Sequence, residues 1–105
     1  MADWVAVCSV DALPPGGRKV VETDAGAVAV FNLEGVLYAI EDVCTHDGGE
    51  LASGCVEGDQ IICPRHGARF CIRNGKALTP PAYEDIECFP VRIKDGIVEV
   101  DIEGA

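Results

Sequence analysis

The chain has 105 residues, of which 49% are hydrophobic and 25% charged, which is the size and composition of one folded domain. Eighteen acidic residues against eight basic ones give a formal net charge of −10, which argues against binding to nucleic acid or to an anionic membrane surface. No apolar run approaches the roughly 18 residues needed to cross a bilayer, so we expect a soluble protein.

The first forty residues predict an antiparallel meander. Residues 11–17 hold two prolines and two glycines and predict a loop, and Asp24-Ala25-Gly26 predicts a turn. Glu34-Gly35 separates two apolar runs by two residues, as in a tight hairpin. We therefore expect strands at residues 4–10, 19–21, 27–33 and 36–40.

The second half also reads as short strands separated by turns. Turns are predicted at residues 57–59 and at Asn74-Gly75, and residues 79–82 form a stiff proline loop. Strands are expected at residues 60–63 and 68–72, and a final hairpin at 89–102 alternates apolar and polar residues around Asp95-Gly96. Because no segment has a helical period, we predict an all-β fold. It would be a single domain over residues 1–105, an antiparallel sandwich of two or three sheets.

Four side chains of metal-binding type lie in two short motifs, each predicted to occupy a hairpin loop at one end of the sheets. Cys44-Thr45-His46 gives one Cys and one His, and Cys63-Pro64-Arg65-His66 gives the others. The two motifs contain both histidines of the chain. Two thiolates and two imidazoles suit either one tetrahedral zinc or a two-iron cluster in which His replaces Cys on one iron.

The spacing of the four ligands favours iron. Zinc modules usually group their ligands as Cys-x2-Cys followed by His-x3-His. Here each loop mixes a thiolate with an imidazole, which suits a loop that sends Cys to one iron and His to its neighbour. A mononuclear zinc module, acting as an interaction domain, stays the alternative on these residues alone.

The other four cysteines are expected to be buried thiols. Cys8, Cys55, Cys71 and Cys88 are few enough to act as small hydrophobic side chains in the core. The chain does not start with the basic and apolar regions of a signal peptide, so a reducing, cytoplasmic setting is expected rather than a disulfide framework.

The two motifs, with Phe70, Gly75 and the Pro80-Pro81 loop after them, resemble the Rieske [2Fe–2S] family over the whole chain. The resemblance implies one [2Fe–2S] cluster, bound by residues in the part from about 43 to 82. Cys44 and Cys63 would bind one iron, and His46 and His66 would bind the outer iron. It also implies three stacked antiparallel sheets and a proline loop that shields the cluster.

Within that family the chain is similar to the small ferredoxins of bacterial aromatic-ring-hydroxylating dioxygenases. Rieske subunits of respiratory cytochrome complexes carry a disulfide at the positions of Gly49 and Arg65, and Ser and Tyr hydroxyls at those of Ala68 and Phe70. With fewer donors near the sulfurs, the reduction potential should lie towards the low end of the Rieske range, which spans about −150 to +300 mV.

The function implied is electron transfer and not catalysis. Both histidines are committed, so none is left for the two-His, one-carboxylate site of an oxygenase, and no Gly-x-Gly-x-x-Gly turn could hold NADH or FAD. We expect a monomeric carrier between an NAD(P)H-dependent flavin ferredoxin reductase and the Rieske centre of a terminal oxygenase, docking through the tip that bears Arg65. The alternative is the small Rieske subunit of an assimilatory nitrite reductase.

Overall fold

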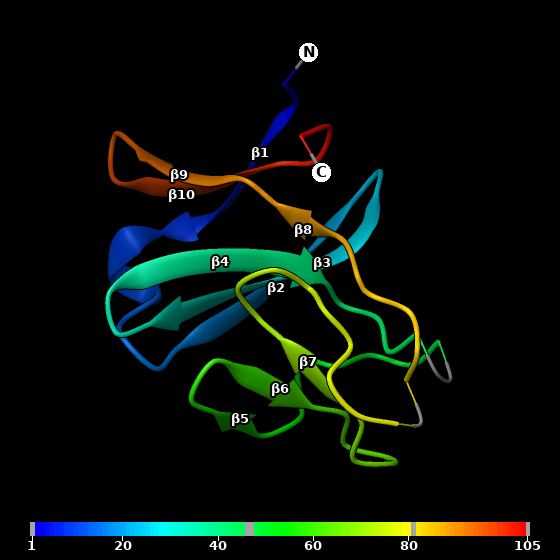
Figure 1. Ribbon diagram of the computed structural model, residues 1–105. Helices are drawn as coiled ribbons and strands as arrows, with labels where there is room; N and C mark the ends of the chain where they lie inside the picture. The colour runs from blue at the N-terminus through cyan, green and yellow to red at the C-terminus, as the bar shows by residue number, and fades with distance from the viewer. Residues whose placement is uncertain (1, 46–47, 81, 105) are drawn as a thin grey trace.

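The computed structural model describes residues 2–45, 48–80 and 82–104, and within them the backbone forms ten strands and one short 3₁₀ helix (Figure 1). The strands of the first half are β1 (Trp4–Ser9), β2 (Arg18–Thr23), β3 (Gly26–Leu33) and β4 (Val36–Glu41), with the 3₁₀ helix η1 (Val10–Ala12) after β1. Those of the second half are β5 (Val56–Glu57), β6 (Gln60–Ile62), β7 (Arg69–Cys71), β8 (Cys88–Phe89), β9 (Val91–Lys94) and β10 (Ile97–Asp101).

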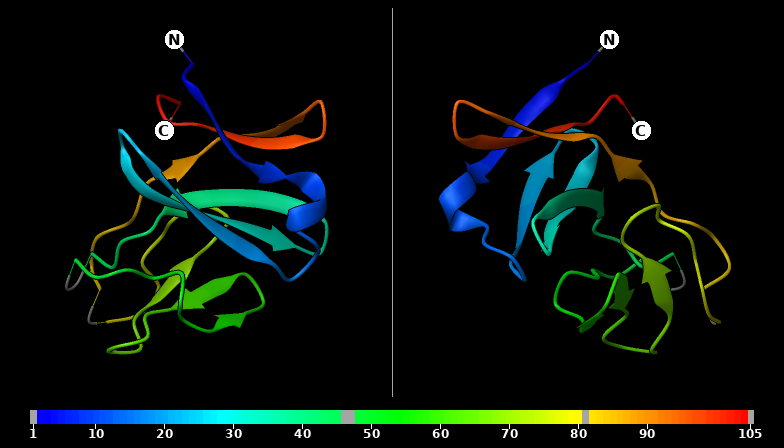
Figure 2. Two further views of the ribbon diagram at one scale, coloured as in Figure 1. Left: turned by 180° about the vertical axis from the view of Figure 1, so that it is seen from behind. Right: turned by 60° about the vertical axis from the view of Figure 1, so that its left-hand side comes forward.

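These strands form three antiparallel sheets, which confirms the predicted all-β fold. The strand orders are β1-β10-β9, β2-β3-β4-β8 and β5-β6-β7. The four-stranded sheet lies in the middle, with the β1-β10-β9 sheet at one end and the β5-β6-β7 sheet at the other (Figures 1 and 2). No helix in the described ranges is long and apolar enough to span a bilayer.

The central sheet separates two apolar cores, which explains the nearly continuous apolar run of β3. Ala29 and Phe31 face the core shared with the β5-β6-β7 sheet, whereas Val28 and Val30 face the core shared with β10. Because alternate residues of a strand point to opposite faces, a strand buried on both sides must be apolar at successive positions.

Two tight turns set the register of their hairpins as the sequence predicts. Glu34-Gly35 between β3 and β4 has φ angles of 54° and 97°, and Asp95-Gly96 between β9 and β10 has 53° and 77°. Positive φ at both central residues is the type I′ pattern, whose twist matches that of the flanking strands.

Two details of the predicted topology are wrong. β1 pairs with β10 and not with β2, so the first forty residues do not form one meander. The loop that carries Cys44 is not a hairpin either, because it leaves β4 in the central sheet and enters β5 in the small sheet. The loop that carries Cys63 does join the antiparallel neighbours β6 and β7, as a hairpin should.

Candidate metal centre

The first ligand loop (residues 43–50) closes around the backbone of Cys44. The Cys44 N–H donates to the carbonyl of Gly49 at 2.7 Å, and the Gly48 N–H donates to the Cys44 carbonyl at 2.7 Å. Gly48 has φ +75°, a left-handed conformation that costs glycine little and other residues more. Both backbone groups of this cysteine are therefore fixed within its own loop.

The second ligand loop (residues 63–68) repeats this construction around Cys63. The Cys63 N–H donates to the carbonyl of Ala68 at 2.7 Å, and the Gly67 N–H donates to the Cys63 carbonyl at 3.0 Å. Gly67 has φ +76°, almost the value of its counterpart in the first loop. Two segments of unlike sequence thus present a cysteine at the same place in the same backbone turn.

The two cysteine side chains meet inside the molecule. Cys44 is 0% and Cys63 2% exposed, and both belong to the core shared by the central and small sheets. Burial raises the pKa of the Cys63 thiol. Hydrogen bonds to its sulfur from the backbone N–H groups of His66 and Arg65 and from the Cys44 thiol, with the charge of Arg65, outweigh that effect and bring the pKa below its ordinary value.

The predicted histidine ligands, unlike the two cysteines, are not both seen in the core. His66 is exposed, three residues after the buried Cys63, and His46 lies outside the described residues. Within the described part of the chain, no three His, Cys, Asp or Glu side chains gather into one metal site. Two buried thiols, with an exposed histidine three residues after one of them, fit a cluster whose two irons take different ligands, and fit poorly a single zinc that four ligands surround.

Two residues that the sequence reading missed hold the segment directly after the first ligand loop. Asp42 Oδ1 accepts the N–H groups of Leu51 and Ala52, both at 2.8 Å. Arg18 on β2 donates from Nη1 to the carbonyls of Ala52 at 2.7 Å and Gly54 at 2.6 Å. The only signal for Asp42 was its place two residues before Cys44, and nothing nearby in the sequence pointed to Arg18.

The segment that contains the predicted proline loop bonds to residues in or next to both ligand loops. Thr45, next to Cys44, donates its hydroxyl to the carbonyl of Glu84 at 2.7 Å. Thr79 Oγ1 accepts the N–H of Arg69, just after the second ligand loop, at 3.0 Å. Pro81 lies outside the described residues. The described part of this loop therefore packs beside the site, as a shielding role requires.

The prediction for the remaining cysteines is wrong at one position. Cys71 is buried and Cys8 and Cys88 are half-buried, but Cys55 is exposed. It precedes the two-residue strand β5, which lies at the edge of the small sheet. All six cysteines lie in the described part of the chain, and none of them forms a disulfide.

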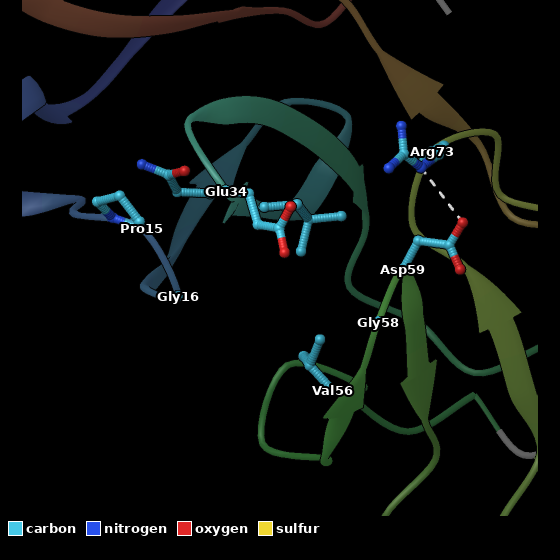
Figure 3. A pocket seen from close by; sticks show the side chains of 9 residues that line it. Pro15, Gly16, Glu34, Val56, Gly58, Asp59 and Arg73 are labelled. Carbon is cyan, nitrogen blue, oxygen red and sulfur yellow. Dashed lines mark hydrogen bonds and ion pairs between the residues drawn. The ribbon is translucent and has the colours of Figure 1, made fainter.

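A hollow of about 520 Å³ lies away from the two cysteines, beside the β3–β4 turn (Figure 3). Its lining includes Glu34, Asp59 and Arg73, but neither a Cys nor a His of the described residues. Arg73 pairs with Asp59 at 3.2 Å and lies over the ring of Tyr38. Because its described lining holds neither a Cys nor a His, this hollow is not the predicted metal site.

Comparison with known proteins assigns the family. Residues 3–90 match the Rieske [2Fe–2S] domain. The biphenyl dioxygenase ferredoxin subunit of Pseudomonas sp. (strain KKS102) is 41% identical, covering 97% of this chain and 94% of that protein.

Two solved structures share the fold. A chain of the complex of reduced oxygenase and oxidized ferredoxin in carbazole 1,9a-dioxygenase has a TM-score of 0.90 and 33% identity, covering 97% of this chain and 95% of its own. A protein assigned as the small subunit of an NADH-dependent nitrite reductase from Mycobacterium tuberculosis has a TM-score of 0.83 and 26% identity, covering 96% of each chain. The chain belongs to the Rieske [2Fe–2S] domain family.

Proposed function

We propose that this protein is a one-electron carrier that takes electrons from an NAD(P)H-dependent flavin ferredoxin reductase and passes them to the Rieske centre of a terminal ring-hydroxylating dioxygenase. The observation that carries the proposal is the buried pair Cys44 and Cys63, set in two matching loops under the exposed His66. The carrier role is supported by relatives that are ferredoxin subunits and span nearly the same length.

In this proposal Cys44 and Cys63 bind one iron of a Rieske [2Fe–2S] cluster, and His46 and His66 bind the outer iron. The cluster supplies one reversible electron when it is bound. The protein buries the thiolates, donates backbone N–H groups to the sulfur of Cys63 and leaves the edge at His66 open to a partner. With two thiolates and two neutral imidazoles the oxidised site sums to zero charge and the reduced site to −1.

The carrier works as one domain over residues 1–105, with the cluster-binding part at about 43–82. We place it in the cytoplasm, where a reducing environment keeps thiols such as Cys55 unpaired. We propose that it acts as a monomer, which size-exclusion chromatography with light scattering would check. It has no catalytic residues of its own.

The small subunit of an assimilatory nitrite reductase is the second candidate, and the similarity to the Mycobacterium tuberculosis protein supports it. It is the weaker one, because the dioxygenase ferredoxins share more identical residues with this chain. The two candidates differ in their assembly. A nitrite reductase subunit would co-purify with a large sirohaem protein, whereas a ferredoxin would purify alone.

The experiment that tests the proposal reconstitutes electron transfer from three purified components: a reductase, this protein and a terminal oxygenase of the biphenyl dioxygenase type. We expect hydroxylated product only when all three are present. The net charge of −10 should attract basic docking surfaces, so turnover should fall as salt rises from 0.1 to 1 M and the Debye length shrinks from about 10 to about 3 Å.

The control replaces this protein with its metal-free form, which keeps the charge and cannot carry the electron. Product formation without the protein, or with its metal-free form, would contradict the carrier role. Turnover that does not change with salt would leave that role intact and contradict the electrostatic part of the prediction.

A further inference from the structure

Arg65 contacts both ligand loops, one through its backbone and the other through its side chain. Its backbone N–H donates to the sulfur of Cys63 in its own loop. Its Nη2 atom donates to the carbonyl of Glu50 in the first loop at 2.8 Å, across 15 positions of sequence. The residue expected to serve docking therefore also joins the two halves of the site.

The guanidinium of Arg65 lies directly against Gly49. A Cβ atom at Gly49 would be 2.5 Å from both Cζ and Nη2 of Arg65, so a side chain at this position would displace the guanidinium. The carbonyl of Gly49 in turn accepts the N–H of Cys44. The two residues in this contact each make a hydrogen bond to one of the cysteines: Gly49 to the backbone of Cys44, and Arg65 to the sulfur of Cys63.

Glu50 gives the guanidinium a fixed anionic neighbour. Its Oε1 lies 3.6 Å from Nη1 of Arg65 and accepts the Ser53 hydroxyl at 2.7 Å, while Oε2 accepts the Ser53 N–H at 3.1 Å. These hydrogen bonds, with a smaller contribution from the charge of Arg65, lower the pKa of Glu50, so the carboxylate is ionised at neutral pH. The carboxylate is half exposed, so the ion pair adds less than the hydrogen bond.

We propose that Arg65 is a positioning residue that clamps the first ligand loop to the second. The clamp keeps the two buried cysteines at the separation that the cluster requires. This inference rests on the proposed function, because it takes Cys44 and Cys63 as ligands. The clamp is expected to slow opening of the site and hence loss of the cluster. The positive charge beside the site is expected to have a separate effect, because it stabilises the reduced state and raises the reduction potential.

Three variants separate the clamp from the charge. Gly49→Ala displaces the guanidinium and keeps its charge in the chain. Arg65→Lys keeps the charge beside Cys63 and loses the planar fork, and Arg65→Gln removes both. Arg69→Gln is the matched control, because the Arg69 side chain is also 34% exposed but pairs with Glu57 in the small sheet.

The primary measurement is the rate at which visible absorbance is lost when a chelator is added to the cluster-loaded protein. A partly exposed, charge-assisted hydrogen bond predicts about fivefold faster loss in Gly49→Ala, Arg65→Lys and Arg65→Gln, and a change within about twofold in Arg69→Gln. Voltammetry should show the largest fall in potential in Arg65→Gln, since only that variant removes the charge next to the site.

Loss of the cluster at the parental rate in both Gly49→Ala and Arg65→Lys would overturn the clamp. Should Gly49→Ala fail to fold, Arg65→Lys and Arg65→Gln carry the test, because they change a surface side chain. Iron and sulfide analysis of the parent protein keeps the two proposals apart. A parent without iron and sulfide refutes the proposed function, whereas a loaded parent with unaffected variants refutes only the clamp.

Discussion

Replacing Cys63 with serine is expected to leave a colourless protein with less than one iron per chain. The side chain is buried at the centre of the site, and a hydroxyl replaces the thiolate whose sulfur accepts two backbone N–H groups. Cys44→Ser should have the same result because its loop is built in the same way. Visible absorption, with iron and sulfide analysis of anaerobically purified protein, gives the readout.

The histidine variants test the other half of the ligand set. His66→Ala and His46→Ala are expected to remove or destabilise the outer iron, whereas the controls Cys8→Ser and Cys88→Ser should keep the parental colour. Both control residues are half-buried and lie outside the two ligand loops, Cys8 on β1 and Cys88 on β8. Bleaching in either control, or a normal spectrum in Cys63→Ser, would show that the assigned ligands are wrong.

Gly75→Ala is expected to be among the most destabilising single changes that add one methyl group. Gly75 has φ +78°, and a Cβ there would collide with the carbonyl of Ile86. Its own N–H donates to the carbonyl of Cys71 and its carbonyl accepts the N–H of Ile86, both at 2.8 Å, so it joins the end of β7 to the segment before β8. The neighbouring backbone cannot move away without breaking those bonds.

Gly96→Ala is the matched control for that change. Gly96 has φ +77°, almost the same backbone strain, but nothing lies within 4 Å of an added Cβ. The extra collision should make Gly75→Ala about 1–3 kcal/mol less stable than Gly96→Ala, a difference of about 5–20 °C in Tm for a domain of this size. Thermal scans at one heating rate measure it. Equal Tm values would show that the close approach to Ile86 does not constrain the fold.

Local signals predicted most of the elements because local physics decides them. Two-residue turns at Glu34-Gly35 and Asp95-Gly96 adopt the backbone that their hairpins require, and alternating residues mark β9 and β10. The stretch of residues 27–33, apolar except at Asn32, indicated a strand, and the structure adds that it divides two cores. These features depend on neighbours in sequence.

The pairing of strands that are far apart in the sequence could not be predicted from local sequence patterns. β1 pairs with β10 because both present apolar residues to the same core, and a hydrophobic pattern does not specify its partner strand. A local reading also did not predict that the first ligand loop joins two different sheets, or that Arg18 on β2 bonds to the segment directly after that loop. The sequence around Cys55 does not indicate that this side chain is exposed either.

The sequence motifs predicted a set of four ligands, which stays a prediction, but not the contacts that hold the two loops in place. The spacing of Cys44 and His46, and of Cys63 and His66, predicted the ligand types and the two-loop arrangement, and the structure brings the two cysteines together. The contact of Arg65 with Gly49 and Glu50 could not be predicted, because it depends on how two separate loops approach each other in space; Glu50 and Arg65 are 15 positions apart in the sequence.

A reductive titration of the purified protein, followed by visible absorption, tests the central claim most directly. The account predicts two irons and two sulfides per chain, uptake of one electron per chain, full recovery on reoxidation, and a midpoint potential below zero, in the low part of the Rieske range of about −150 to +300 mV. Such a protein can carry an electron from a flavin reductase to an oxygenase. A colourless protein that holds one zinc and takes up no electron would contradict the account.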